Sequence, residues 1–117
     1  MLRHAADMPR EQRTHMRQGD GTVTLTAALS PEDYQAPVRL FSRITLPVGA
    51  SIGRHVHEDE EEFFYFLSGE GSFDDNGVTI PVKAGDATVT RSGEAHALRN
   101  TGAGPLELVA VIVSLKK

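Results

Sequence analysis

The 117-residue chain contains no cysteine. This absence excludes disulfides, thiolate metal sites, iron–sulfur clusters and a cysteine nucleophile. Any metal ion must therefore be held by histidine and carboxylate side chains. A chain of this length is large enough to form one domain with its own core and too short to form two.

Blocks of basic residues and long apolar runs are also missing. Sixteen acidic residues outnumber twelve basic ones, which gives a formal net charge of −4. Because the lysines and arginines do not cluster, the attraction to phosphate that drives nucleic-acid binding is absent, and we expect no nucleic-acid partner. The N-terminus has no apolar signal region, and no segment approaches the roughly 18 apolar residues of a membrane span. We therefore expect a cytoplasmic protein without a membrane partner.

The hydrophobic pattern predicts strands, since helical periodicity nowhere persists over about ten residues. About nine short apolar or alternating segments are separated by turn signals at regular intervals, which is typical of an all-β sandwich or barrel. The predicted strands cover residues 22–27, 38–46, the region of His55 and His57, 62–67, 71–73, 78–80, 87–90, 95–100 and 106–115.

Residues 1–20 are polar and lack an apolar stripe. They are predicted to form a flexible N-terminal arm, followed by a barrel domain at residues 21–117. His4 and His15 lie in this arm without a motif around them, so we expect them to be solvated rather than to bind a metal.

Two histidines and a glutamate stand out in the centre of the chain. On a helix, side chains two residues apart would diverge by about 200°, so His55 and His57 would face away from each other. On a strand they project from the same face, with Cα atoms about 6–7 Å apart. Glu62 opens the aromatic strand that follows. The strand interpretation lets two imidazoles and a carboxylate converge on one ion.

This stretch resembles the first motif of the cupin family, G-x5-H-x-H-x(3,4)-E-x6-G. The matching residues are Gly49, His55, His57, Glu62 and Gly69. A later stretch resembles the second cupin motif, G-x5-P-x-G-x2-H-x3-N. The matching residues are Gly85, Gly93, His96 and Asn100, and Arg91 stands where the motif has proline.

The resemblance covers about residues 38–115 and implies an all-β, single-domain double-stranded β-helix, the jelly-roll barrel of the cupins. It also implies one divalent transition metal ion per chain, held by His55, His57, Glu62 and His96. Imidazole suits iron, nickel, copper and zinc, and manganese tolerates the mixed donor set, so the residues do not distinguish among these metals. We expect Asn100 to be a structural hydrogen-bonding residue.

Three imidazoles and one carboxylate leave two adjacent positions open in an octahedral field, where a chelating carboxylate, or a substrate atom and dioxygen, can bind. The resemblance implies a metal-dependent enzyme that acts on a small polar molecule, of the dioxygenase or decarboxylase type, although no catalytic residue can be named. The alternatives are a Lewis-acid isomerase or lyase and a cupin that binds a small molecule without turnover. Histidines that merely pack a core are disfavoured, because buried polar groups need partners.

The strand at residues 38–46 leaves two arrangements open. If its apolar side chains form the core, Arg39 and Arg43 lie outside; if it lines a polar cavity, either arginine could hold an anionic substrate. Phe41, Phe64 and Phe66 are candidates for an apolar pocket wall.

The acidic run at residues 58–61 is predicted to be a solvated loop. Both faces of the aromatic strand at residues 62–67 are apolar, so we expect its outer face to meet a second sheet or a second subunit. Small cupins commonly pair through their N-terminal strands, and we therefore expect a homodimer.

Overall fold

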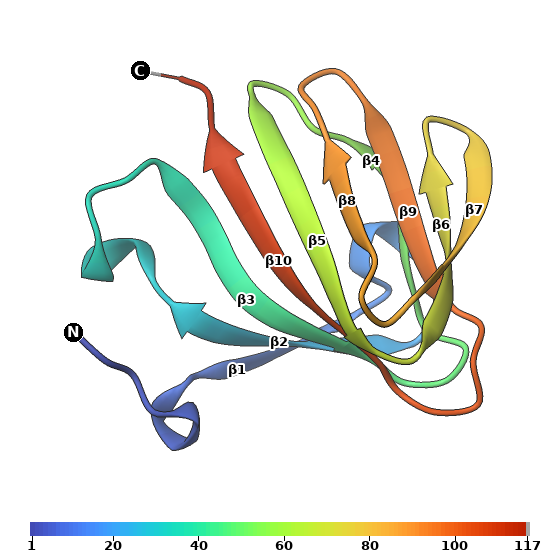
Figure 1. The fold of residues 1–117 in the computed structure, drawn as a ribbon, viewed down its shortest axis with the longest axis horizontal. Coiled ribbons are helices and arrows are strands. Elements are labelled where there is room, and N and C mark those ends of the chain that lie inside the picture. The colour runs from blue at the N-terminus through green and yellow to red at the C-terminus, as the bar shows by residue number, and fades with distance from the viewer. Residues whose placement is uncertain (117) are drawn as a thin grey trace.

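The computed structural model describes residues 1–116 and consists of two antiparallel sheets packed face to face (Figure 1). The larger sheet has the strand order β1-β2-β3-β10-β5-β8, and the smaller has the order β4-β9-β6-β7. From β3 to β10 the chain passes back and forth between the two sheets, with the β6–β7 hairpin within the smaller sheet, as in a jelly roll. The predicted all-β barrel is confirmed.

The strands of the larger sheet are β1 (Arg10–Thr14), β2 (Thr22–Leu29), β3 (Val38–Leu46), β10 (Leu106–Ser114), β5 (Glu60–Ser68) and β8 (Ala87–Thr90). Those of the smaller sheet are β4 (Ser51–Val56), β9 (Ala95–Asn100), β6 (Glu70–Asp75) and β7 (Val78–Lys83). Three 3₁₀ turns complete the described elements: η1 (Ala5–Asp7), η2 (Met16–Gln18) and η3 (Pro31–Asp33).

The core lies between the sheets and follows the two-residue period of the strands. On β3, Ser42, Ile44 and Leu46 point inward and are buried, whereas Arg43, between Ser42 and Ile44, is exposed. Phe66 on β5 and Leu108 on β10 are fully buried against them. Because alternate side chains of a strand share a face, this pattern sets the register of the central strands β3, β10 and β5.

The hairpin between β6 and β7 forms where Asp74 to Gly77 predicted a tight turn. Asn76 and Gly77 both have positive φ angles, of 52° and 91°. This conformation is the one that a two-residue turn requires, and asparagine and glycine adopt it at low cost. The predicted hairpin is confirmed.

Residues 10–14 correct the expectation for the N-terminal arm. They form β1, which pairs with β2 from Arg10 opposite Thr26 to Thr14 opposite Thr22. Every side chain of β1 is exposed, so the segment carries no apolar alternation that would reveal a strand. Backbone hydrogen bonds to the edge of β2 hold it instead.

The outer face of the larger sheet carries a row of apolar side chains that no second sheet of the described chain covers. The strand register places Phe41, Val111, Phe63 and Val89 side by side across β3, β10, β5 and β8. Tyr65 lies in the next row and is 51% exposed, and Phe63 is 40% exposed. The outer face of β5 was predicted to meet a second sheet or a second subunit. Within residues 1–116 no second sheet covers it, so the second subunit stays the prediction.

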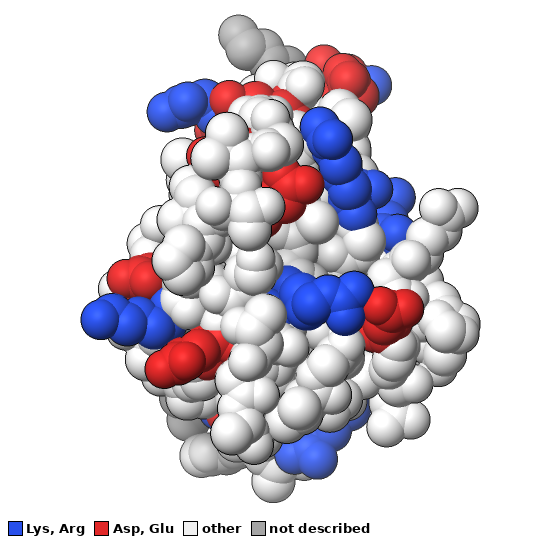
Figure 2. Space-filling model, turned by 90° about the vertical axis from the view of Figure 1, so that its right-hand side faces the viewer, with Lys and Arg blue, Asp and Glu red and all other residues white. Residues whose placement is uncertain are grey.

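Charged side chains of opposite sign are interspersed on the face that carries β7 and β8, and neither sign forms a block there (Figure 2). Among residues 1–116, no helix has the length and apolar character needed to cross a membrane.

Candidate metal centre

Four side chains meet at one end of the barrel, where the connections from β4 to β5 and from β8 to β9 lie together at the top of Figure 1. They are His55, His57, Glu62 and His96, the residues that both cupin-like motifs indicated. His55 on β4 is the cross-strand partner of His96 on β9. Glu62 reaches them from β5 in the facing sheet, and His57 follows the last residue of β4.

The donor atoms are close together. Oε1 of Glu62 lies 2.9 Å from Nε2 of His57 and 3.0 Å from Nε2 of His96. Nε2 of His96 lies 3.0 Å from Nε2 of His57 and 3.2 Å from Nε2 of His55. With metal–nitrogen bonds of about 2.1 Å, adjacent ligands of an octahedron are about 3.0 Å apart, so these separations suit one ion at the centre.

Each imidazole has an outer partner at its other nitrogen. His55 donates from Nδ1 to the carbonyl oxygen of Gly53 at 2.8 Å, and His57 donates from Nδ1 to the carboxylate of Glu60 at 2.6 Å. Nδ1 of His96 lies 2.7 Å from the hydroxyl of Thr90. With the proton on Nδ1, the lone pair of each Nε2 points into the cluster, which is the tautomer that a metal ligand needs.

The surroundings shift the pKa values of three of these groups. Burial lowers the pKa of His55 to about 4, so this imidazole is neutral. Burial also acts to lower the pKa of His57, but hydrogen bonds with Glu62 and Glu60 outweigh it, and the pKa is raised. Burial acts to raise the pKa of Glu62, but hydrogen bonds from His57 and His96 lower it to about 2. Glu62 is therefore ionised, and a proton on His57 competes with a cation for the same position.

The donor set fits a divalent transition metal ion. When all three imidazoles carry their protons on Nδ1, their Nε2 lone pairs and the carboxylate oxygen repel one another at about 3 Å, and a cation between them removes this repulsion. His96 is held in place by stacking on Phe64, with ring centroids 5.1 Å apart. The ion would be held by Nε2 of the three histidines and by the carboxylate of Glu62, and it would supply an electrophilic point in a sheltered cavity.

A cavity of about 70 Å³ lies beside the cluster and is lined by His55, His57 and Glu62. Its remaining wall is apolar apart from three arginines; it comprises Arg13, Met16, Arg17, Leu25, Arg39, Leu40, Ile44, Ile52, Phe64 and Ile112. The cavity is therefore small, sheltered and positively charged around the metal ligands.

Some of the residues on β3 and β5 that were candidates for the pocket wall line this cavity, and others do not. Arg39 lines the cavity, whereas Arg43 lies on the outer face with Glu107, 2.6 Å away. Phe64 lines the cavity as predicted. Phe41 and Phe66 were wrong candidates for the wall: Phe41 belongs to the outer row, and Phe66 is fully buried in the core.

Glu60 corrects the prediction that residues 58–61 form a solvated loop. Its side chain is 16% exposed and accepts hydrogen bonds from Arg39 at 3.0 and 2.9 Å as well as from His57. Asp59 has a positive φ of 58°, which turns the chain so that Glu60 faces back toward His57. Arg39, Glu60 and His57 thus form a chain of charge-assisted contacts that sequence spacing did not reveal.

Glu60→Gln should weaken metal binding by about 10–100-fold, because the neutral amide makes His57 a weaker donor. Glu58→Gln is a matched control, since it removes the same charge from an exposed neighbour. A competition titration against a chelator of known affinity measures the metal affinity of both variants. Equal affinities in the two variants would show that Glu60 does not support His57.

Asn100 and Arg91 complete the second motif in structural roles. Asn100 is buried and donates to the carbonyl oxygens of Leu46 and Gly104, both at 2.9 Å, so the expected structural role is confirmed. Arg91 donates its backbone N–H to Glu94 at 2.8 Å. Proline has no N–H, so this turn uses a hydrogen bond where the motif uses a rigid ring.

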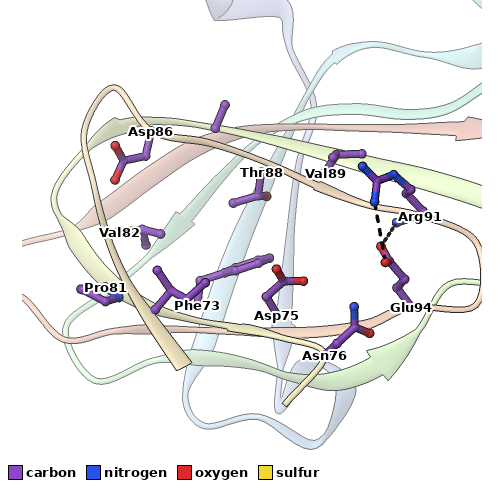
Figure 3. A pocket seen from close by; sticks show the side chains of 12 residues that line it. Phe73, Asp75, Asn76, Pro81, Val82, Asp86, Thr88, Val89, Arg91 and Glu94 are labelled. Carbon is purple, nitrogen blue, oxygen red and sulfur yellow. Dashed lines mark hydrogen bonds and ion pairs between the residues drawn. The ribbon is translucent and has the colours of Figure 1, made fainter. Parts of the chain in front are cut away.

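A larger cavity of about 470 Å³ lies between the β6–β7 hairpin and β8 (Figure 3), and none of the four candidate metal ligands lines it. Two of its three carboxylates are engaged in turns: Glu94 pairs with Arg91, and Asp86 accepts the backbone N–H of Lys83. Among residues 1–116, the group that could hold a metal ion is the cluster described above.

The two-sheet barrel and its cluster of imidazole and carboxylate donors define a class of protein. The sequence profile of the cupin domain family matches residues 42–112, and the chain belongs to that family.

Individual relatives are also similar. An oxalate-binding protein from Thermotoga maritima is 45% identical over 115 residues, which are 98% of this chain and 95% of that protein. The crystal structure of a predicted oxalate decarboxylase from Thermotoga maritima superposes with a TM-score of 0.94 at 45% identity, covering 98% of this chain and 100% of that one. A tetracenomycin polyketide synthase protein from Streptomyces glaucescens is 27% identical over 99 residues, which are 85% of this chain and 64% of that protein.

Proposed function

We propose that the chain binds one divalent transition metal ion through His55, His57, Glu62 and His96 and, at that ion, a small carboxylate of the oxalate class. The observation that carries this proposal is the convergence of four donor atoms beside a small cavity with arginines in its wall. Two open positions on such an ion suit a chelating dicarboxylate, and the positive wall favours an anion. The name of the oxalate-binding relative supports the same ligand class.

Binding without turnover is favoured over decarboxylation. When a carboxylate leaves as carbon dioxide, the remaining carbon must receive a proton, so the site needs a proton donor. Among the described residues that line the cavity, the acids and bases other than arginine are His55, His57 and Glu62, which all belong to the cluster. Glu60 is held by Arg39 and His57 and does not line the cavity. Dioxygenase activity and Lewis-acid isomerase or lyase activity stay predictions from the sequence. A cytoplasmic location also stays a prediction.

Elemental mass spectrometry on tag-free protein purified without chelator tests the metal, and isothermal titration with oxalate tests the ligand. We expect about one ion per chain after loading with manganese, iron, nickel or zinc, and oxalate binding only in the loaded protein. Formate release and oxygen consumption are measured in the same samples. A protein that cannot be loaded contradicts the proposal, and sustained formate release would replace binding by decarboxylase activity.

We also propose that two chains pair through the outer face of the larger sheet, in the region of Phe63, Tyr65 and Val89. Contiguous exposed apolar side chains typically mark interaction surfaces, and these residues form adjacent rows on one face of the larger sheet.

Tyr65→Glu should convert the dimer to a monomer, because it places a charge in the centre of this apolar face. Light scattering after gel filtration measures the mass. Val78→Glu is the control, since Val78 is 61% exposed on β7 in the other sheet. A monomeric wild-type chain at micromolar concentration, or a dimeric Tyr65→Glu variant, would contradict this interface.

A further inference from the structure

The turn between β1 and β2 has an unusual backbone. His15, Arg17 and Gln18 have φ angles of 55°, 53° and 66°. Side chains other than glycine rarely adopt this left-handed region, and such residues persist only where the surrounding structure holds them. Met16, the first residue of η2, packs against the core and lines the metal cavity together with Arg17.

Two glycines hold this turn against β4. A Cβ atom on Gly53 would overlap the carbonyl oxygen of Arg17, and one on Gly19 would overlap the carbonyl oxygen of Ser51. The backbones can approach this closely only because both positions lack a side chain. Gly53 also accepts the hydrogen bond from His55. The backbone that carries Arg17 is therefore fixed directly beside the strand that carries His55.

The three arginines of the cavity differ in their partners. Arg39 forms an ion pair with Glu60 at 2.9 Å, and Arg13 forms one with Glu11 at 3.0 Å. Arg17 makes no ion pair and no side-chain hydrogen bond within residues 1–116. Arg17 and His55 line the same cavity, so the unpaired guanidinium belongs to the wall next to the cluster.

We propose that Arg17 binds the free carboxylate oxygens of a dicarboxylate in this cavity and makes the site selective for dianions over monoanions of the same size. The inference rests on the proposed function. A dicarboxylate that chelates an ion through one oxygen of each carboxylate keeps two further oxygens on its other side. The planar fork of a guanidinium matches two such oxygens, and Arg17 is the arginine of this wall that no carboxylate of the described chain occupies.

The test compares oxalate with oxamate, a monoanion of similar size, by isothermal titration of manganese-loaded protein. Arg17→Gln should weaken oxalate binding by about 10–100-fold, the effect of losing a hydrogen bond between charged groups, and should weaken oxamate binding much less. Arg17→Lys should lie between Arg17→Gln and the wild type, because lysine keeps the charge without the fork. Arg54→Gln is the control: Arg54 is an exposed arginine on β4 and does not line the cavity.

Circular dichroism and manganese content are measured for every variant, and both should equal those of the wild type. Unchanged oxalate affinity in Arg17→Gln would overturn the inference while leaving the proposed function standing. An equal loss of oxalate and oxamate affinity would overturn the selectivity. A wild-type chain that binds manganese but no oxalate overturns the proposed function, and the inference falls with it.

Discussion

His57→Ala and His96→Ala should each abolish stable metal binding. Both side chains are 2% exposed and bring Nε2 to within 3.0 Å of the Glu62 carboxylate, so each supplies a central donor. The loss should exceed the roughly 10–100-fold effect of removing an outer partner, because the donor itself disappears. Elemental mass spectrometry after loading and gel filtration measures the ion content per chain.

His4→Ala is the matched control, because it removes an exposed histidine outside the cluster. His96→Ala also removes the stacking on Phe64, so circular dichroism must show that the variant is folded. His96→Gln keeps more of the side-chain volume and serves if the alanine variant is unfolded. Wild-type ion content in both folded variants would disprove the assignment of these residues as ligands.

Stripping the metal should lower the melting temperature by on the order of 10 °C. A ligand that binds only the folded chain at about 1,000 times its dissociation constant stabilises it by about 4 kcal/mol. In a domain of this size each kcal/mol shifts the melting temperature by several degrees. Calorimetry of chelator-treated and reloaded protein measures the difference.

The melting temperature of the stripped protein should depend on pH in a way set by two histidines. The raised pKa of His57 contributes stability that is present below about pH 6.5 and is lost as the pH rises through its folded value. The lowered pKa of His55, about 4, acts in the opposite sense: stability is lost as the pH falls from about 6.5 toward 4. Together, the pKa shifts of His57 and His55 place the highest melting temperature of the stripped protein near pH 6.5.

The stabilisation by metal should instead grow as the pH rises from 6 to 8, because protons on His57 compete with the ion. Melting curves of stripped and reloaded protein across this range separate the two effects. A metal-induced shift that is constant with pH would show that the ion does not displace a proton from the cluster.

Local patterns predicted much of the fold. The alternation over residues 38–46 gave the bounds of β3, and Asn76 with Gly77 gave a hairpin turn. These features follow from the side-chain period of a strand and from the φ angles that a turn requires, which act between near neighbours. Strand β1 was missed because its exposed side chains carry no such period.

The amino-acid sequence by itself determined the class of barrel and which four side chains meet, because His55, His57, Glu62 and His96 stand at the ligand positions of two motifs that resemble those of the cupins. Only the tertiary structure decided what surrounds them. Glu60 reaches His57 through the left-handed turn at Asp59, and Arg17 reaches the cavity because two glycines let η2 approach β4. Contacts of this kind depend on how distant backbone segments pack, and no periodicity along the chain records them.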